Sequence, residues 1–289
     1  EGALHAAARK ERDRNEQGNA GKDDEREPDI DGGMRLCIRL MLFTDLDTER
    51  TVKHIYQKGA KNLRKDITET YNVALDGPAG SGKSTVAKAV ARKLGIIYVD
   101  TGAMYRTVAL HCRQKNIAWE QEAEVVSALD SLKMKIVPEE GGQKIFLNDV
   151  DVTAEVRVAE IGKGASAVAA YPKVRERMVQ MQQEMAKVNS VIMDGRDIGT
   201  VVLPEAEVKV YLDAGVEERA RRRVGELEAK GETADLEEIK KMIIQRDYND
   251  MNREHSPLKK ADDAIVLDST SMTVEEVEQA IMDIVAERV

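Results

Sequence analysis

Residues 72–95 read NVALDGPAGSGKSTVAKAVARKLG and join a short apolar run to a glycine-rich loop and a longer amphipathic segment. The loop fits the pattern G-x-x-x-x-G-K-[S/T] from Gly77 to Ser84, and it lies between an expected strand and an expected helix. Glycines let the backbone curl so that successive N–H groups point at phosphate oxygens, and the following helix N-terminus adds partial positive charge. The stretch therefore predicts a P-loop that binds a nucleotide.

The residues of this loop have distinct expected roles. Lys83 can reach the β- and γ-phosphates, and the Ser84 hydroxyl can ligate Mg²⁺. The expected ATP-binding set is Gly77, Pro78, Ala79, Gly80, Ser81, Gly82, Lys83, Ser84 and Thr85. No N-K-x-D guanine motif occurs in the sequence, which disfavours a GTPase-type switch protein. Motor ATPases and small-molecule kinases share this loop, so the reaction must be inferred from the rest of the chain.

Short apolar runs alternate with helical stretches on both sides of the loop. Strands are expected at 71–76, 96–100, 190–194, 207–213 and 263–268, and helices at 83–95, 101–115, 173–188, 215–230, 235–253 and 273–287. This alternation predicts an α/β fold with a parallel sheet flanked by helices on both faces. One segment, LKMKIVPEEGGQKIFLNDVDVT at 132–153, predicts instead a hairpin around Glu140, Gly141 and Gly142 and hence a small antiparallel insertion.

Composition excludes several classes of protein. A net charge of −9 and an aromatic content of 3% disfavour a nucleic-acid-binding protein. No apolar run approaches the roughly 18–20 residues that span a bilayer, and no signal-peptide pattern is present, so no membrane association and a cytoplasmic location are expected. Cys37 and Cys112 lack metal-ligand spacing and are expected to be reduced thiols. Because the chain starts at Glu1, we expect a fragment or a trimmed sequence.

Arginine and aspartate are concentrated in four further segments, DTGAMYR (100–106), GASAVAAYPKVR (164–175), DGRDIGTVV (194–202) and RDYNDMNR (246–253). With GPAGSGKST before them and VLDST after them, in this order, residues from about 71 to 289 closely resemble bacterial cytidylate kinase. The resemblance implies a P-loop nucleoside monophosphate kinase fold with a helical lid. It also implies ATP as donor, Mg²⁺ as cofactor, CMP or dCMP as acceptor, and a monomeric kinase part.

The resemblance assigns roles to individual residues. The arginines that match the acceptor-phosphate ligands, and that form the expected catalytic set together with Lys83, are Arg106, Arg196 and Arg253. Guanidinium groups suit a dianionic phosphate because they donate paired hydrogen bonds. The residues that match the cytosine-reading positions are Ser166, Arg175 and Asp197, and those that match the pentose contacts are Arg246 and Asp250. Thr101 matches a further position of the CMP site, where its hydroxyl would take the place of a serine's.

Two further regions are interpreted through the same resemblance. Residues about 131–165 match the enlarged monophosphate-binding insertion, and residues about 215–232 match a mobile lid. The lid arginines expected to close over the transferring phosphoryl group are Arg219, Arg222 and Arg223. Asp194 ends an expected strand, where it could act on Mg²⁺ like a Walker-B aspartate or serve as a helix cap or turn residue; the sequence leaves both roles open.

The resulting prediction is transfer of the γ-phosphoryl group of ATP to CMP or dCMP. Catalysis would rest on positioning and on charge neutralisation by Mg²⁺, Lys83 and the arginines, because a phosphate nucleophile needs no strong base. One alternative is another P-loop phosphotransferase that acts on a different small molecule. A second is a nucleotide-binding regulatory module without turnover.

The segment upstream of residue 71 resembles a different enzyme. EPDIDGGMRLCIRLMLF (27–43) and KHIYQKGAKNLRKDI (53–67) resemble the C-terminal part of trimeric, barrel-like chorismate mutase, an α+β fold. Positions that match its active site are Glu27, Arg39, Tyr56 and Arg64, whereas Cys37 is expected to pack in the fold. Roughly the first half of that domain has no counterpart, since residues 1–26 are polar and expected to be disordered. We therefore expect a vestigial mutase segment at 27–67, a linker at 68–71 and a kinase domain at 72–289. A bifunctional enzyme that also rearranges chorismate to prephenate, and a coincidental strand–helix appendage, are the alternatives.

Overall fold

The computed structural model describes residues 70–139, 142–229 and 231–289. The strands of the main sheet are β1 (Asn72–Asp76), β2 (Ile97–Asp100), β6 (Val191–Gly195), β7 (Val208–Asp213) and β8 (Ile265–Asp268). A smaller sheet consists of β3 (Met134–Glu139), β4 (Gly142–Leu147) and β5 (Val150–Asp151). The mutase-like segment, with Glu27, Arg39, Tyr56, Arg64 and Cys37, lies outside the described residues, as do the expected disordered segment and the first half of the linker.

Helices connect and cover these strands. The α-helices of the described residues are α4 (Lys83–Leu94), α5 (Thr101–Gln114), α6 (Glu122–Ala128), α7 (Ala159–Val168), α8 (Pro172–Ala186), α9 (Val216–Glu228), α10 (Leu236–Asn252) and α11 (Val274–Arg288). Shorter helical segments are η2 (Leu129–Ser131), η3 (Glu155–Arg157) and the π-helical turn η4 (Ile198–Val202).

The main sheet is parallel, and its strand order is β2-β6-β1-β7-β8. β1 lies at its centre, where Leu75 is opposite Asp194 of β6 and Val210 of β7. Because the strands are parallel, their carboxyl ends meet at one edge, which is where ligands bind in sheets of this kind. The P-loop follows β1 and the DGRD segment follows β6, so the register brings these two motifs together.

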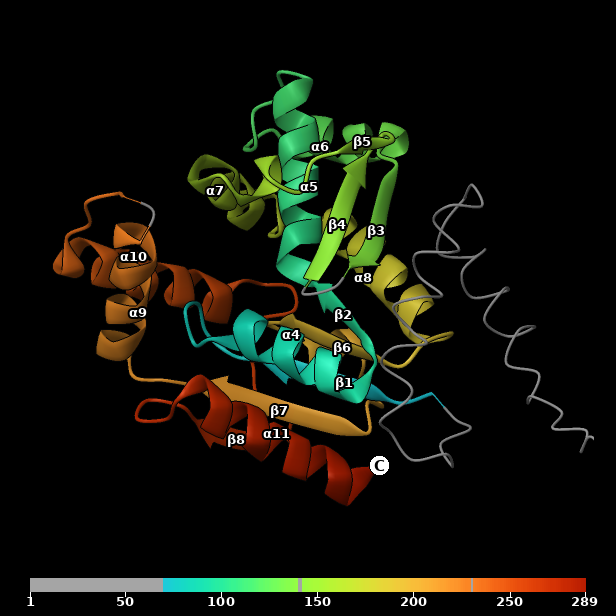
Figure 1. Cartoon of the computed structure of the whole chain (residues 1–289). Helices are drawn as coiled ribbons and strands as arrows, with labels where there is room; N and C mark the ends of the chain where they lie inside the picture. The colour runs from blue at the N-terminus through green and yellow to red at the C-terminus, as the bar shows by residue number, and fades with distance from the viewer. Residues whose placement is uncertain (1–69, 140–141, 230) are drawn as a thin grey trace, which may run out of the picture. The chain divides into compact units, whose positions relative to one another are not determined.

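Alternating residues of the strands enter two separate apolar cores. Val73 and Leu75 of β1 face the core shared with α4 and α11, whereas Ala74 faces the core shared with α5 and α8. This alternation produces helices on both faces of the sheet (Figure 1). The predicted α/β class, with its parallel sheet, is confirmed.

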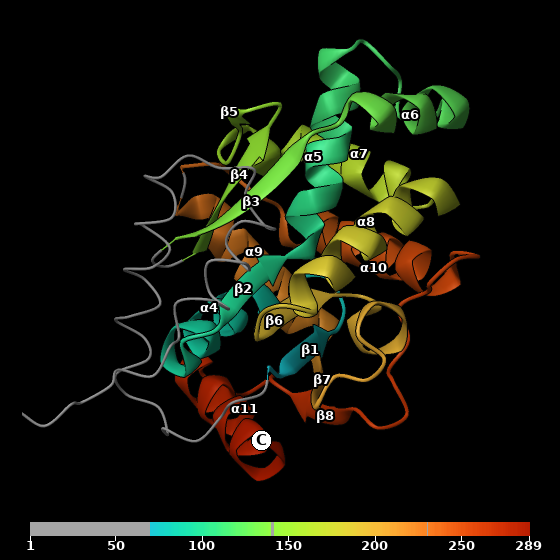
Figure 2. The same ribbon diagram turned by 90° about the vertical axis from the view of Figure 1, so that its right-hand side faces the viewer.

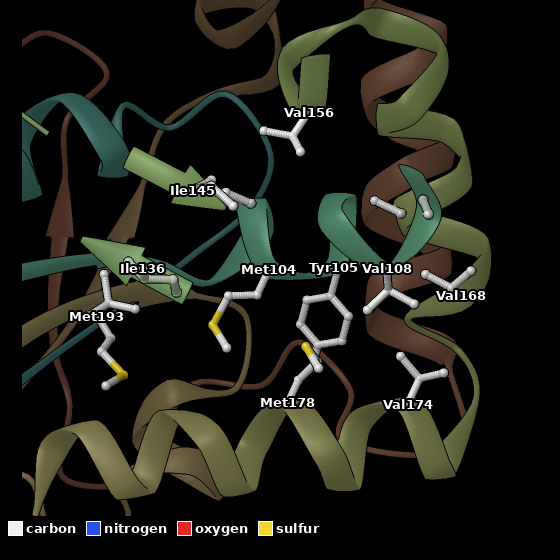
Figure 3. Packing of buried hydrophobic residues seen from close by; sticks show 14 of the residues in the cluster. Met104, Tyr105, Val108, Ile136, Ile145, Val156, Val168, Val174, Met178 and Met193 are labelled. Carbon is white, nitrogen blue, oxygen red and sulfur yellow. The ribbon is translucent and has the colours of Figure 1, made fainter. Parts of the chain in front are cut away.

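The second core extends from the main sheet into the insertion through α5. Met104, Tyr105 and Val108 of α5 contact Met178 and Val174 of α8, as Figure 3 shows. The same core includes residues of β3, β4 and α7, so α5 lies between the main sheet and the insertion (Figure 2). The predicted hairpin is confirmed, because β3 and β4 pair antiparallel from Met134–Leu147 to Glu139–Gly142.

The helical elements that were not predicted from the sequence are α6, α7, η2, η3 and η4. α7 has the sequence AEIGKGASAV, with two glycines that lower helix propensity, and its packing on α5 outweighs this cost. Gly164 of α7 allows close contact, because an added Cβ would lie 2.4 Å from the Trp119 ring. The π-helical turn depends on a distant carboxylate, described below, and local sequence could not reveal it.

Candidate active site

The P-loop leaves β1 in a backbone conformation that only glycine accommodates. Gly77 has φ 149° and lies against the end of β7, where an added Cβ would be 2.0 Å from the carbonyl oxygen of Leu212. Gly82 has φ 88° and forms the N-terminal cap of α4, so the helix begins at Lys83. The loop thus directs backbone N–H groups and a helix N-terminus at one place, the arrangement that binds phosphate.

Lys83 is buried at the base of this loop. Its Nζ donates to the Pro78 carbonyl at 2.6 Å and to the Ser81 hydroxyl at 3.1 Å. Burial, and next the positive charge of Arg196, lower the pKa of Lys83 well below its ordinary value. An ammonium group that is desolvated in this way interacts strongly with any phosphate that comes within reach.

The Asp194 side chain forms its hydrogen bonds with Ser84 of the P-loop and Tyr98 of β2. The Ser84 hydroxyl donates to Asp194 Oδ2 at 2.7 Å, and the Tyr98 hydroxyl donates to Asp194 Oδ1 at 2.9 Å. Burial, and next the nearby Asp100, raise the pKa of Asp194. The carboxylate caps no helix, so of the two roles left open by the sequence, this geometry favours the one beside the phosphate site.

The pair of Ser84 and Asp194 is the donor set that fits Mg²⁺. Within residues 70–289, outside the three undescribed positions, no cluster of three or more histidine, cysteine, aspartate or glutamate side chains could hold a metal by itself. Mg²⁺ usually binds through one or two carboxylates together with substrate phosphates, so a single hydroxyl and carboxylate beside a P-loop suffice.

Asp76 connects the donor loop with the acceptor segment. It is the last residue of β1, and its two carboxylate oxygens accept from the backbone N–H groups of Ile198 and Gly199 at 2.8 and 2.7 Å. Burial raises the pKa of Asp76 to about 6, although these two hydrogen bonds act in the opposite direction. One carboxylate therefore fixes the start of η4 and, with it, the direction of the preceding Arg196 and Asp197.

The acceptor side contains a chain of alternating charges. Arg175 is ion-paired with Asp197, and Asp197 Oδ1 lies 3.7 Å from Arg253 Nη2. Arg253 Nη1 in turn lies 3.9 Å from Asp250 Oδ1, and Asp250 Oδ2 accepts from Arg196 Nε at 2.8 Å. Although burial alone would raise it, Arg196 and its neighbours hold the pKa of Asp250 below its ordinary value.

This network has more positive charge than its aspartates neutralise. Arg246 and Arg106 act electrostatically on one another and lie beside the network. With them included, the network comprises five arginines and two aspartates. Desolvation and the charge of Arg196 lower the pKa of Arg246 to about 10, although part of its side chain is exposed. Arg175 Nε and Arg253 Nη2 are buried without a hydrogen-bond partner among the described residues. The pocket therefore suits an anionic ligand that also accepts hydrogen bonds.

The remaining predicted residues lie at different distances from this network. The Thr101 hydroxyl donates to the Asp194 carbonyl at 2.7 Å, which joins α5 to the end of β6. Arg106 lies on α5, and its electrostatic influence reaches Arg246. Ser166 is exposed on α7. This helix ends beside Ala169, and the Ala169 carbonyl accepts from Arg175 Nη1 at 3.2 Å.

The three predicted lid arginines of α9 do not share one environment. Arg219 is buried and donates to the carbonyl of Ala79 in the P-loop at 2.8 Å. Arg222 Nη2 donates to the Ser269 carbonyl at 2.6 Å, and its Nη1 would lie 3.7 Å from a Cβ on Gly82. Arg223 is paired with Glu226 on the surface of α9 at 2.8 Å, so the structure does not bring it to the P-loop.

Residue-level reasoning from the sequence missed Asp76, Tyr98 and Asp247. Asp247 accepts from the Ala79 N–H at 3.1 Å and is ion-paired with Arg219 at 2.5 Å. A signal for Asp76 existed, since it is one of several aspartates that end apolar strands. Nothing local distinguishes Tyr98 from an ordinary strand residue.

A P-loop beside a cationic arginine–aspartate network, on a parallel sheet, is the arrangement of a P-loop phosphotransferase. The family model described as cytidylate kinase matches residues 73–287. The chain accordingly belongs to the cytidylate kinase family, as the resemblance of its motifs had predicted. A second model, chorismate mutase type I, matches residues 8–67; this match contains the predicted 27–67 segment and begins earlier.

Relatives support the same family. The cytidylate kinase of Leuconostoc mesenteroides is 49% identical over 215 residues, which cover 74% of this chain and 96% of the relative. The cytidylate kinase of Geobacillus sp. is 50% identical over 217 residues, which cover 75% of this chain and 97% of the relative. Among solved structures, TT1252 from Thermus thermophilus has a TM-score of 0.40 and 20% identity, with coverage of 77% of this chain and 100% of that one. In the described part of this chain, no helix has the length and apolar character needed to cross a membrane.

Proposed function

We propose that residues 72–289 transfer the γ-phosphoryl group of ATP to CMP or dCMP, yielding ADP and CDP or dCDP. The observation that carries this proposal is the arginine–aspartate network beside the P-loop, with its surplus positive charge and its two buried guanidinium nitrogens that make no hydrogen bond within the described residues. A nucleoside monophosphate supplies both a dianionic phosphate and hydrogen-bond acceptors. The kinase part acts as a monomer in this proposal, since both subsites lie on one chain.

The donor side holds the triphosphate through the P-loop. Backbone N–H groups within residues 80–84 surround the phosphates, since the Ala79 N–H donates to Asp247. Lys83 leaves its contacts with Pro78 and Ser81 for the β- and γ-phosphates. Bound Mg²⁺ would neutralise charge on the transferring group, and Ser84 and Asp194 would hold it. Tyr98 orients the Asp194 carboxylate by donating to its other oxygen.

The acceptor side holds and orients the nucleophile. Arg106, Arg196 and Arg253 bind the acceptor phosphate, and their charges stabilise the negative charge that the transition state shares among its oxygens. Arg196 exchanges part of its contact with Asp250 for the phosphate, which leaves Asp250 and Arg246 able to bind the pentose hydroxyls. Closure of the segment at about 215–232, with Arg222 and Arg223, excludes water and so limits hydrolysis of ATP.

Recognition of the base rests on Asp197 with Arg175 and Ser166. Asp197 is buried and fixed by Arg175 on one oxygen, and a carboxylate has about four lone-pair sites, so it can still accept from a third donor. The N4 amine of cytosine is such a donor, whereas uracil presents an acceptor at that position. The network therefore favours CMP over UMP.

A coupled assay of ADP formation tests the proposal. ATP, Mg²⁺ and the purified chain are incubated with CMP, dCMP, UMP or AMP in turn. We expect ADP formation to depend on CMP or dCMP and to be much slower with the others. Faster turnover of AMP, or of a small alcohol, would show a different phosphotransferase, and ATP binding without acceptor-dependent turnover would show a regulatory module.

We also propose that residues 27–67 are an inactive remnant of a chorismate mutase, joined to the kinase domain by a linker at 68–71. Support for the relation to a mutase comes from the chorismate mutase type I match at residues 8–67. Loss of chorismate absorbance in the presence of the chain would contradict the proposal and would make the protein bifunctional, with Glu27, Arg39, Tyr56 and Arg64 as its site.

A further inference from the structure

Helix α10 contacts both halves of the candidate site through neighbouring residues. Arg246 and Asp250 belong to the acceptor network, whereas Asp247 contacts the P-loop on the donor side. α10 also packs along α9, as Figures 1 and 2 show. A single rigid helix therefore spans the two subsites between which a phosphoryl group would move.

Asp247 and Arg219 together hold both polar groups of one P-loop residue. The Ala79 N–H donates to Asp247 Oδ1 at 3.1 Å, and the Ala79 carbonyl accepts from Arg219 Nη1 at 2.8 Å. The same Nη1 lies 2.5 Å from Asp247 Oδ2, so the two side chains also bind each other. All three residues are buried.

Arg219 extends this contact to the end of β7. Its Nε donates to the Ala214 carbonyl at 2.8 Å, directly after the last residue of that strand. An added Cβ on Gly80 would lie 3.4 Å from the Cβ of Arg219, so the loop passes tightly against α9 here. The guanidinium thus joins the P-loop, the end of β7 and α10 through its Nε and Nη1.

A buried ion pair of this kind contributes less to the free energy of unfolding than to the position of the groups that it holds. Apolar residues can often replace a buried ion pair with little loss of stability, whereas the geometry of its hydrogen bonds is lost. In-line phosphoryl transfer depends strongly on that geometry, because a displacement of about 1 Å can reduce the rate on the order of a hundredfold.

We propose that Arg219 and Asp247 form a positioning clamp that sets the P-loop at a fixed distance from the acceptor residues of α10. This inference rests on the proposed kinase function. The clamp acts through the N–H and the carbonyl of Ala79, so we assign both residues as positioning residues rather than catalytic residues.

The test compares two clamp variants with a matched surface variant. Arg219→Met/Asp247→Leu replaces the pair by apolar side chains, and Asp247→Asn keeps an acceptor for the Ala79 N–H but removes the ion pair. Arg177→Met is the control, since Arg177 is exposed on α8, outside the segment at about 215–232, and its contact is Gln180. For each, kcat, both KM values, the Kd for ATP and the melting temperature are measured.

We expect kcat to fall about a hundredfold in the double variant and about tenfold in Asp247→Asn. The KM for CMP should change less than twofold, and Arg177→Met should match the unsubstituted chain. A merely structural role would lower the melting temperature and leave kcat per folded molecule unchanged. A double variant that is folded and retains kcat within twofold would therefore overturn the clamp. If the double variant does not fold, an unchanged kcat in Asp247→Asn overturns it equally.

Failure of the proposed function would be recognised separately. If the unsubstituted chain forms no ADP with any monophosphate, the kinase proposal fails, and the clamp is judged by ATP affinity alone. A tenfold or larger increase in the Kd for ATP in both clamp variants would then support it, and an unchanged Kd would overturn it.

Discussion

The P-loop and the proposed acceptor site are built in opposite ways. The P-loop is one continuous segment, Gly77–Thr85, that uses backbone N–H groups and a single buried lysine. The pocket draws side chains from α5, α8, α10 and the segment before η4, and its arginines are largely held by aspartates. The difference teaches that the donor side depends on the shape of one loop, whereas the acceptor side depends on a balance of charges between distant segments.

This difference determines how each region should respond to substitution. Removal of the one charge in the P-loop deletes a contact with the reacting group and leaves few unpaired partners behind. Removal of an arginine from the pocket also releases an aspartate that was bound to it. The expected effects therefore decrease from the donor lysine to the acceptor network and then to the groups that position it.

The largest effect is expected from Lys83→Ala. Loss of a preorganised charge at the transferring phosphate costs on the order of 10²–10³ in kcat. The melting temperature should stay close to that of the unsubstituted chain, because the lysine is buried with a lowered pKa and contacts only the P-loop itself. The coupled ADP assay measures the loss, and near-normal turnover in a folded variant would contradict the assignment of the donor site.

Arg196→Ala should affect the acceptor more than the donor. We expect kcat/KM for CMP to fall about 10², with little change in the KM for ATP, since Arg196 is held by Asp250 on the acceptor side. The matched control is Arg177→Ala, an exposed α8 residue whose contact is Gln180 at 3.4 Å. Equal losses for ATP and CMP, or no loss for CMP, would show that the two regions are not separate as described.

Asp197→Asn tests specificity rather than rate. An amide in place of the carboxylate can offer an N–H to the O4 of uracil, so the ratio of kcat/KM for CMP over UMP should fall about tenfold or more. Both substrates are measured on one preparation of the variant. Any loss of folded protein caused by the missing Arg175 ion pair therefore affects both rates equally and leaves their ratio unchanged. An unchanged ratio would remove Asp197 from the base-reading set.

The same contrast explains how much could be predicted from the sequence. A continuous backbone site has a fixed spacing, so the P-loop and the helix after it were predicted with correct boundaries to within one residue. The parallel sheet followed from alternating elements. The acceptor residues lie up to 147 positions apart, from Arg106 to Arg253, and were assigned only through the family resemblance.

The aspartates that end the parallel strands show where sequence reasoning stopped. Asp100 caps α5 through the Ala103 N–H, Asp194 binds Ser84, and Asp268 accepts from Thr270 in its own turn. Asp76, with the same position in its strand, reaches the backbone of η4 instead. These roles depend on which segment crosses the sheet edge beside each carboxylate, and that is a property of tertiary packing.

The smallest effect concerns the pH dependence that Asp76 introduces. Its pKa is raised from 3.8 to about 6 in the folded protein, so the folded state binds more protons between these values. The free energy of unfolding should therefore fall as pH rises through this window and level off above about pH 6. Between pH 5 and pH 7, titration of Asp76 should lower the free energy of unfolding by about 1 kcal/mol, which is measurable as a shift of the urea midpoint.

Affinity for the acceptor should move in the opposite direction over the same window. Ionised Asp76 accepts from both Ile198 and Gly199, whereas the protonated acid loses part of this capacity and loosens the turn that carries Arg196 and Asp197. The KM for CMP should therefore rise as pH falls below about 6. Asp76→Asn is the control, since it cannot titrate, and it also corrects for titration of the CMP phosphate itself. Identical pH profiles of stability and KM in the two proteins would show that Asp76 does not connect the donor loop to the acceptor pocket.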